Sequence, residues 1–289
     1  LLQPLQIGKL TIKNRFCVGP LTLPSLHGPF GEFSENGLAY FEERAKGGFG
    51  LIFTGAFHPD TLVDPVHPLD SKQPLKAPKS FQRSAVELLE RLDAYGAKMM
   101  PQVSMGYGRN ALGCFCPSEI PYYHDPARIA PALTKDQIKQ KIDQMIATAV
   151  LLKQCGFPGI EVHAMHWGYL LDQFHSTLWN KRTDEYGGEL KNRLRFTIEC
   201  LQQIKEQAGE DFPVIIKYTA NHHMEGGREL SEGVEMAKLF EEAGADALHV
   251  DGGCIDLWYK QIPSVYGPEK LLVDDVAAVK AAFRIPVIG

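Results

Sequence analysis

The segment TKDQIKQKIDQMIATAVLLKQCGFPGIEVH, from Thr134 to His163, contains the pattern that decides the fold class. Thr134 is a suitable helix N-cap, and Gly156 suits the C-terminal end of the same helix. Between them, apolar side chains recur at helical spacing and form one stripe, made by Ile138, Ile142, Met145, Ile146, Ala149 and Leu152. A short apolar run, Gly159–His163, follows directly. The segment therefore predicts a helix that leads into a buried strand.

The same alternation of short apolar runs and helical segments continues along the chain. Strands are predicted at Arg15–Gly19, Gly50–Thr54, Lys98–Val103, Gly159–His163, Val214–Tyr218, Ala247–Val250 and Pro286–Gly289. Helices are predicted at Glu35–Lys46, Ser80–Tyr95, Thr134–Cys155, Leu190–Ala208, Ser231–Ala243 and Val273–Phe283, with N-caps at Ser34, Thr134 and Ser231. Parallel neighbouring strands require such crossover helices. No G-x-G-x-x-G motif follows a strand, which disfavours a dinucleotide-binding fold.

We therefore expect an α/β protein with the (β/α)8 TIM barrel architecture, cut short after its seventh strand. Residues Gln6–Leu10 and Thr11–Asn14 are expected to pair as a hairpin that plugs the floor of this barrel.

The composition excludes several classes of protein. The 289 residues are 44% hydrophobic and 22% charged, as in ordinary globular domains. A formal charge of -5 lacks the basic bias of nucleic-acid binding proteins, and no apolar run is long enough to span a membrane. Six cysteines are scattered along the chain, a pattern typical of reduced thiols and a cytoplasmic location.

TIM barrels carry their chemistry at the carboxyl ends of their strands. The residues at these positions suggest a flat heteroaromatic ligand. Pro20, Leu21, Thr22 and Gly55 would allow the backbone to approach a ring closely. Gln102 can both donate and accept hydrogen bonds, and Lys217 would place a positive charge beside such a ring. Alternatively, Gln102 only bonds at a strand end and Lys217 pairs with a buried carboxylate.

The segment Glu161–Phe174 contains His163, His166 and Tyr169 at intervals of three residues. Two imidazoles placed in this way can donate hydrogen bonds to one developing oxyanion, and a tyrosine beside them can supply a proton. A metal site is the competing interpretation, with Glu161, Asp251 and His249 as further ligands. The structural interpretation is a pair of buried histidines satisfied by their neighbours.

Four stretches together resemble the old yellow enzyme family of flavin-dependent ene-reductases. They are PLQIGKLTIKNRFCVGPLT (Pro4–Thr22), PQVSMGYGR (Pro101–Arg109), HAMHWGYLLDQF (His163–Phe174) and NKRTDEYGGELKNRLRF (Asn180–Phe196). Within that family they are most similar to the branch of enoate reductases, 2,4-dienoyl-CoA reductases and bile-acid-inducible oxidoreductases.

The resemblance implies an NAD(P)H-dependent FMN enzyme. FMN would contact Pro20, Leu21, Thr22, Gly55, Gln102 and His163, with Lys217 near its pyrimidine end. His163 and His166 would hold the oxygen of an α,β-unsaturated carbonyl or carboxylate, the flavin would give a hydride to the β-carbon, and Tyr169 would protonate the α-carbon. The reverse reaction, desaturation of a 3-oxo compound, is equally allowed.

The substrate is less defined by the resemblance. Trp167 departs from most family members and is interpreted as part of an apolar substrate wall, with Arg109 as a further substrate-binding residue. A steroid or bile-acid enone, an enoate or an enoyl-CoA would each fit. A homo-oligomer is allowed but not required.

The resemblance also implies that further protein follows the C-terminal end of this sequence. The family holds the FMN phosphate with loops after strands seven and eight, and the longer branch members add a four-iron four-sulfur cluster and domains for FAD and the nicotinamide. Residues 1–289 lack the cysteine spacing of that cluster and are predicted as the FMN barrel of a longer protein, with Cys114 and Cys116 inert or substrate-facing. Asp184–Gly188, Asn192 and Arg193 are predicted to be structural. A metal-dependent barrel lyase or hydrolase, and a non-catalytic barrel subunit, are the alternative functions.

Overall fold

The computed structural model describes residues 1–59, 62–64, 72–164, 169–260, 262, 264–267 and 269–289. Its parallel strands are β3 (Cys17–Val18), β4 (Leu51–Phe53), β5 (Lys98–Met100), β6 (Gln102–Ser104), β9 (Ile160–His163), β10 (Val214–Asn221), β11 (Ala247–Gly252) and β12 (Val287–Ile288). They pair in the orders β3-β4-β5 and β6-β9-β10-β11-β12, and a parallel bridge between Phe57 and Val103 connects the two groups. Because β5 and β6 are two parts of one predicted strand, divided at Pro101, the seven predicted strands are all confirmed.

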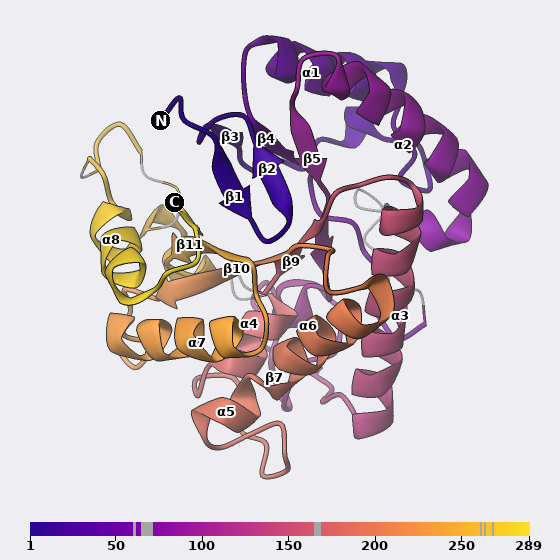
Figure 1. Ribbon diagram of the computed structural model, residues 1–289. Coiled ribbons are helices and arrows are strands. Elements are labelled where there is room, and N and C mark those ends of the chain that lie inside the picture. The colour runs from indigo at the N-terminus through magenta and orange to yellow at the C-terminus, as the bar shows by residue number, and fades with distance from the viewer. Residues whose placement is uncertain (60–61, 65–71, 165–168, 261, 263, 268) are drawn as a thin grey trace.

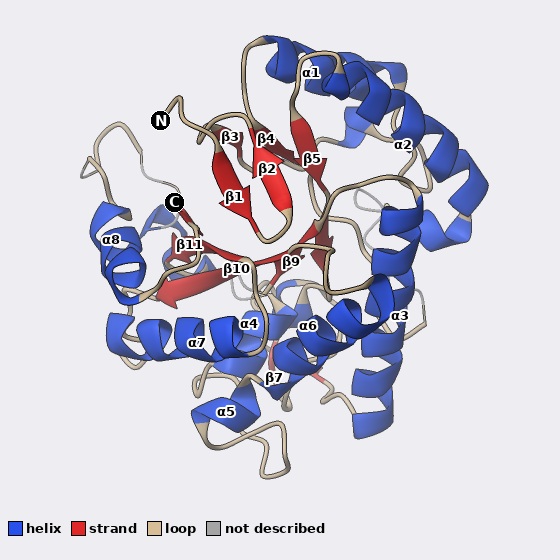
Figure 2. Ribbon diagram, in the orientation of Figure 1, coloured by secondary structure: helices blue, strands red, loops and turns tan. Residues whose placement is uncertain are grey.

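The helices form a ring around these strands, as Figures 1 and 2 show. They are α1 (Glu35–Lys46), α2 (Pro78–Asp93), α3 (Lys135–Gln154), α4 (Leu170–His175), α5 (Leu190–Arg193), α6 (Arg195–Ala208), α7 (Leu230–Glu242) and α8 (Val273–Ala282). Between the ring and the strands lies the main apolar core, in which Phe81, Met145, Phe196 and Phe240 are completely buried. A parallel sheet wrapped by crossover helices is the barrel architecture predicted from the sequence.

A hairpin plugs one end of the barrel, as predicted. Its strands β1 (Leu5–Ile7) and β2 (Leu10–Ile12) are antiparallel, and Figure 1 shows them in front of the parallel strands at the centre of the ring. Ile7 and Ile12 pack inside the barrel against Leu51, Met100 and Ile215. The amino-terminal end of the barrel is therefore filled by apolar side chains.

The helix ends agree with most of the predicted caps. The hydroxyl of Ser34 accepts a hydrogen bond from Gly37 N at 3.1 Å, and Thr134 forms a capping box with Gln137. The prediction for Ser231 was wrong. The helix α7 begins one residue earlier, and Glu229 occupies the N-cap without a side-chain bond.

Three further differences concern short elements. The predicted helix Leu190–Ala208 is divided at Leu194 into α5 and α6. The six-residue helix α4 and a small hairpin, β7 (Ile120–Pro121) with β8 (Ile129–Ala130), were not predicted. Elements this short bury too few residues to produce a recognisable period in the sequence.

Two negative findings apply to the described part of the chain. No helix there combines the length and apolar character needed to cross a lipid bilayer. All six cysteines lie in described segments and none forms a disulfide, although Cys114 and Cys116 are both buried. Burial raises the pKa of the Cys116 thiol well above its ordinary value, which supports the inert interpretation of this pair.

Candidate active site

A pocket of about 340 Å³ lies at the carboxyl ends of the parallel strands. Its walls come from the loops after β3, β4 and β6, from β9 and β10, and from the segment before α4. The residues that line it are Pro20, Leu21, Thr22, Ala56, His58, Gln102, Tyr107, His163, Tyr169 and Lys217. Seven residues proposed from the sequence thus meet at one pocket: Pro20, Leu21, Thr22, Gln102, His163, Tyr169 and Lys217.

Gly55 shapes one wall of this pocket. A Cβ atom at this position would lie 2.7 Å from both the carbonyl oxygen of Leu21 and the Cα atom of Thr22, which is closer than real contacts allow. Glycine therefore lets the end of β4 approach the segment Pro20–Thr22. A direct contact between Gly55 and a cofactor stays a prediction.

A polar layer crosses the barrel beneath the pocket. The amide Nε2 of Gln102 donates a hydrogen bond to Oε1 of Glu161 at 2.7 Å, and Oε2 of Glu161 lies 2.6 Å from Nδ1 of His249. Glu161 is completely buried, so these two contacts replace the water that a carboxylate would otherwise bind. They also fix the orientation of the Gln102 amide, whose second N–H and carbonyl oxygen can face the pocket.

Lys217 extends from β10 at the polar end of the pocket. Its Nζ lies 3.3 Å from Oδ2 of Asp251 on the neighbouring strand β11. The side chains of both residues are largely buried, with exposed fractions of 9% and 12%. Both interpretations of Lys217 are thus compatible with the structure, because the side chain pairs with a carboxylate and also lines the pocket.

Aromatic rings also line the pocket. The rings of His163 and Tyr169 stack with centroids 5.1 Å apart, and the ring of Tyr107 meets Tyr169 edge-on at 4.9 Å. The hydroxyl of Tyr107 lies 3.1 Å from Nε2 of His58. His163 at the end of β9 and three aromatic residues from loops therefore form a continuous wall, which suits an apolar or aromatic ligand.

The segment that carries Tyr169 is anchored by buried charges. Tyr169 is the N-cap of α4, and all six residues of that helix are buried. Asp172 of α4 pairs with Arg228 at 2.8 Å and with His222 at 3.1 Å. Burial alone would raise the pKa of Asp172, but Arg228 and His222 hold it below its ordinary value, so the pair stays charged. This contact fixes α4, and therefore Tyr169, against the loop after β10.

Arg109 has a structural partner in this structure. Its Nη1 lies 2.9 Å from Oδ2 of Asp256, and its backbone N–H donates to Oε1 of Gln173 in α4. The pair joins two loops at the mouth of the barrel. The prediction that Arg109 binds substrate stays a prediction.

The loop between α4 and α5 carries charged residues that bond within the protein, as predicted. Arg182 makes a double contact with Asp184, at 2.6 and 2.9 Å. Arg193 bonds to the carbonyl oxygen of His175 and to Glu232 of α7. These contacts connect α4 and α5 to α7, in agreement with a structural role.

Two of the predicted site residues, His166 and Trp167, lie outside the described residues. Among the described residues, no group of three or more histidine, cysteine, aspartate or glutamate side chains is placed to hold a metal ion. Glu161 and His249, proposed as further metal ligands, instead contact each other.

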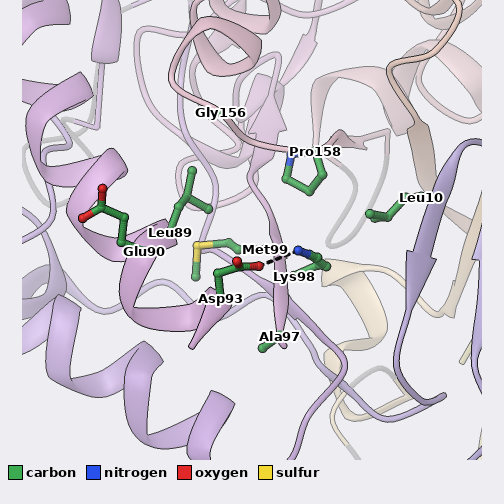
Figure 3. Close-up of a pocket in the computed structure, with 9 residues that line it drawn as sticks. All are labelled: Leu10, Leu89, Glu90, Asp93, Ala97, Lys98, Met99, Gly156 and Pro158. Carbon is green, nitrogen blue, oxygen red and sulfur yellow. Dashed lines mark hydrogen bonds and ion pairs between the residues drawn. The ribbon is translucent and has the colours of Figure 1, made fainter. Parts of the chain in front are cut away.

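A second pocket, of about 360 Å³, lies at the opposite end of the barrel (Figure 3). It is bordered by Leu10 of the hairpin, by Leu89 of α2 and by Pro158. Figure 3 shows Asp93 and Lys98 facing each other, as an ion pair of 2.7 Å with both side chains exposed. Exposed pairs of this kind contribute little stability, and the amino-terminal end of a barrel is not where such folds react.

A model of the NADH:flavin oxidoreductase / NADH oxidase family matches residues 1–289 of the chain. The chain belongs to this family. A cinnamate reductase from Clostridium sporogenes is 37% identical over 308 residues, which span 100% of this chain and 46% of the relative. An NADPH dehydrogenase from Halalkalibacterium halodurans is 32% identical over 248 residues, or 85% of this chain and 71% of the relative.

Solved structures agree with this assignment. A complex of 2-naphthoyl-CoA reductase with 2-naphthoyl-CoA has a TM-score of 0.84 and 26% identity, and covers 99% of this chain and 46% of that chain. Morphinone reductase, at 22% identity and a TM-score of 0.76, shares the fold. The chain spans less than half the length of the cinnamate reductase and of the 2-naphthoyl-CoA reductase chain. The resemblance to old yellow enzymes is confirmed.

Two residues of this NADH:flavin oxidoreductase pocket were missed by the sequence analysis: His58 and Tyr107. His58 and Tyr107 follow strand ends by several residues, in loops whose course is not set by a hydrophobic period. Tyr107 lies within the quoted stretch Pro101–Arg109, where its large ring among small residues was the available signal. His249 and Asp251 were considered only as metal ligands, whereas they contact Glu161 and Lys217.

Proposed function

We propose that this pocket binds FMN and that the chain is the ene-reductase part of an NAD(P)H-dependent flavoenzyme. Its reaction is the reduction of a C=C bond conjugated to a carbonyl or carboxylate. The observation that carries the proposal is that one pocket is lined both by Gln102 and Lys217 and by the stacked pair of His163 and Tyr169.

The donors and acceptors of the pocket fit a flavin. The pyrimidine edge of FMN alternates donor and acceptor atoms, and the Gln102 amide offers both after its bond to Glu161. The segment Pro20–Thr22 supplies backbone groups at the ring edge, and its close packing on Gly55 leaves a flat wall. Lys217 supplies the positive charge that favours reduced flavin.

In the proposed reaction the chain supplies hydrogen-bond donors to the substrate oxygen and a proton donor to the α-carbon. FMN, when bound, supplies the hydride that the β-carbon of the substrate receives. The imidazole of His163 donates a hydrogen bond to the substrate oxygen and stabilises the charge that develops there. His166, which the sequence predicts as a second donor, would act in the same way. The hydroxyl of Tyr169 donates its proton to the α-carbon, on the face opposite the hydride. Because each step is reversible, the same groups would also serve desaturation.

The substrate that we favour is an aryl-substituted α,β-unsaturated acid or its thioester. The wall made by His58, Tyr107 and Tyr169 can stack on an aromatic ring. Names of two similar proteins, a cinnamate reductase and a 2-naphthoyl-CoA reductase, support this class. A steroid or bile-acid enone is the second candidate and rests on Trp167 as a further wall.

The proposed electron route from NAD(P)H to FMN requires domains outside residues 1–289. The similar cinnamate reductase is about twice as long as this chain, which supports further domains. We place the four-iron four-sulfur cluster and the FAD implied by the resemblance there, as the route from NAD(P)H to FMN.

The test is a visible absorption spectrum of the full-length protein, followed by bleaching with NADH under nitrogen and reoxidation by cinnamate, a steroid enone or crotonate. We expect a flavin spectrum that bleaches and then recovers fastest with cinnamate. A protein that retains no FMN after FMN is added and the free flavin is removed would contradict the cofactor assignment. A clear preference for crotonate would exclude both large substrates while leaving the ene-reductase assignment intact.

A further inference from the structure

The charge next to Lys217 is the feature that the proposed function does not use. A lone lysine beside a flavin would favour its reduced, anionic form, because opposite charges attract. In this chain a carboxylate oxygen of Asp251 lies 3.3 Å from the lysine nitrogen, and little of either side chain is exposed. The pair is thus poorly screened by water, and its two charges largely cancel.

The register of the strands places Asp251 toward the mouth of the barrel. Lys217 of β10 is paired with His249 of β11, and Asp251 follows His249 by two residues. Side chains two residues apart on a strand share a face, so Asp251 lies on the same face as His249 and one step closer to the pocket. Its Oδ1 accepts a hydrogen bond from Gly252 N at 2.9 Å, which holds the carboxylate in place.

A second carboxylate adds to this effect. Glu161 lies in the polar layer beneath the pocket, where it contacts His249 and Gln102. Burial raises the pKa of the nearby Cys17 thiol, Glu161 raises it further, and Lys217 opposes the rise. The titratable side chains that the described residues place near Lys217 include Cys17, His163, His249, Glu161 and Asp251. Two of these are carboxylates, so the positive charge of the lysine is not in excess.

We propose that Asp251 offsets the charge of Lys217 and so makes bound FMN a stronger reductant than the lysine alone would allow. Asp251 is a positioning residue in this proposal, since it acts through Lys217. The proposal rests on the proposed function, because it requires FMN in this pocket. A strongly reducing flavin suits alkenes activated only by a carboxylate, which withdraws electrons less than a ketone does.

The experiment measures the midpoint potential of FMN and its dissociation constants in both redox states. It uses the full-length protein, reconstituted with FMN alone so that other centres do not interfere. The main variant is Asp251→Asn, which keeps the oxygen that accepts from Gly252. Asp251→Glu retains the charge. The matched control is Asp246→Asn, which removes a similar buried partner of a lysine, Lys205 at 2.5 Å, just before the start of β11 at the opposite end of the barrel.

In Asp251→Asn we expect reduced FMN to gain about tenfold in affinity relative to oxidised FMN, which raises the potential by about 30 mV for a two-electron couple. Asp251→Glu and Asp246→Asn should keep the wild-type potential, although the latter loses stability. The double variant Lys217→Gln/Asp251→Asn removes both charges and should return the potential close to wild type.

Three outcomes would overturn the inference. The first is an unchanged potential in an Asp251→Asn protein that binds FMN normally. The second is a double variant with a potential as high as that of Asp251→Asn, because Asp251 would then act independently of Lys217. The third is loss of FMN by Asp251→Asn, since removal of the anion should strengthen binding. A wild-type protein that binds no FMN would overturn the proposed function, and this inference with it.

Discussion

The imidazole of His163 and the phenol of Tyr169 stack with their ring centroids 5.1 Å apart and their planes 20° from parallel. One ring comes from the end of β9 and the other from the N-cap of α4, so these two elements bring the rings together. In the proposed reaction this contact places the group that binds the substrate oxygen beside the group that protonates the α-carbon. The two roles can be separated by substitution.

Tyr169→Phe removes the proton donor and keeps the ring stack. We expect the oxidation of reduced FMN by cinnamate to slow by about 10²- to 10⁴-fold, the usual effect of losing a general acid. Reduction of FMN by NADH should not change, because the hydroxyl has no role in that half-reaction. Anaerobic stopped-flow measurements of the two half-reactions would check this, and equal slowing of both would argue against Tyr169 as the acid.

The double variant His163→Ala/His166→Ala removes the expected oxyanion donors. We expect a folded protein with much slower ene reduction, because charge on the substrate oxygen would lose its hydrogen bonds. The circular dichroism spectrum reports folding, and single-turnover rates with cinnamate report the chemistry. Unchanged turnover would remove the central claim of the mechanism.

Tyr107→Ala opens the aromatic wall and removes the ring contact with Tyr169, but leaves the hydroxyl of Tyr169 and the imidazole of His163 in place. Aromatic pairs contribute about 1 kcal/mol, so kcat/KM for cinnamate should fall about fivefold more than kcat/KM for crotonate, which has no ring. Tyr107→Phe serves as the control, because it removes the hydroxyl that lies near Nε2 of His58 and keeps the aromatic ring of the wall. An equal loss for both substrates in the alanine variant would show that the wall does not select aryl groups.

Arg228→Met leaves the Asp172 carboxylate buried without its principal counter-charge. Breaking one partner of a buried pair typically costs about 3–5 kcal/mol, and we expect a loss of that order in the free energy of unfolding. The pKa of Asp172 is depressed in the folded protein, so the pair stabilises above the ordinary carboxyl pKa of about 4 and this stability is lost as pH falls below it. Urea unfolding at pH 7 gives the measurement, with the exposed pair variant Lys98→Met as control. A loss no larger than in the control would contradict the anchoring role.

His27 makes stability depend on pH in the same direction. Burial, and then Lys72, lower the pKa of this histidine to about 3, and its Nδ1 donates to the carbonyl oxygen of Gly31. The unfolded chain, with a pKa of about 6.5, binds more protons between these values, so stability should fall by about 1.4 kcal/mol per pH unit below pH 6. His27→Asn keeps a donor without titrating, and its urea midpoint should be less sensitive between pH 7 and pH 5. Identical pH dependence of the two proteins would show that His27 does not titrate in this way.

The sequence predicted the elements that bury many residues. The seven strands and six long helices follow from apolar periods and from caps such as Ser34 and Thr134, which act locally. The residue Ser231 failed as a cap because α7 already begins at Leu230, and a good capping residue does not prevent a helix from starting earlier. The break at Leu194 was not predicted, because Leu190–Ala208 contains no glycine or proline that would mark it.

The sequence predicted those site residues that have a suitable side chain and also lie near the end of a predicted strand. Gln102, His163 and Lys217 stand near the carboxyl ends of the strands predicted from the sequence, whose location in a barrel is known once the strands are assigned. His58 and Tyr107 reach the pocket from loops, and the partners of Lys217 and Glu161 come from a strand much further along the chain. Such contacts are set by tertiary packing, and no spacing in the sequence encodes them.

The burial of α4 limits how an enzyme of this design can diverge. Every residue from Leu170 to His175 is enclosed, and a change there would disturb the core and the reacting tyrosine together. Leu21 and Tyr107 border the same pocket but keep part of their surface in solvent, so they can vary at small structural cost. If Tyr169 acts as proposed, new substrate ranges should arise by exchange of these rim positions over an unchanged α4, and a mutagenesis library aimed at new acceptors should begin with them.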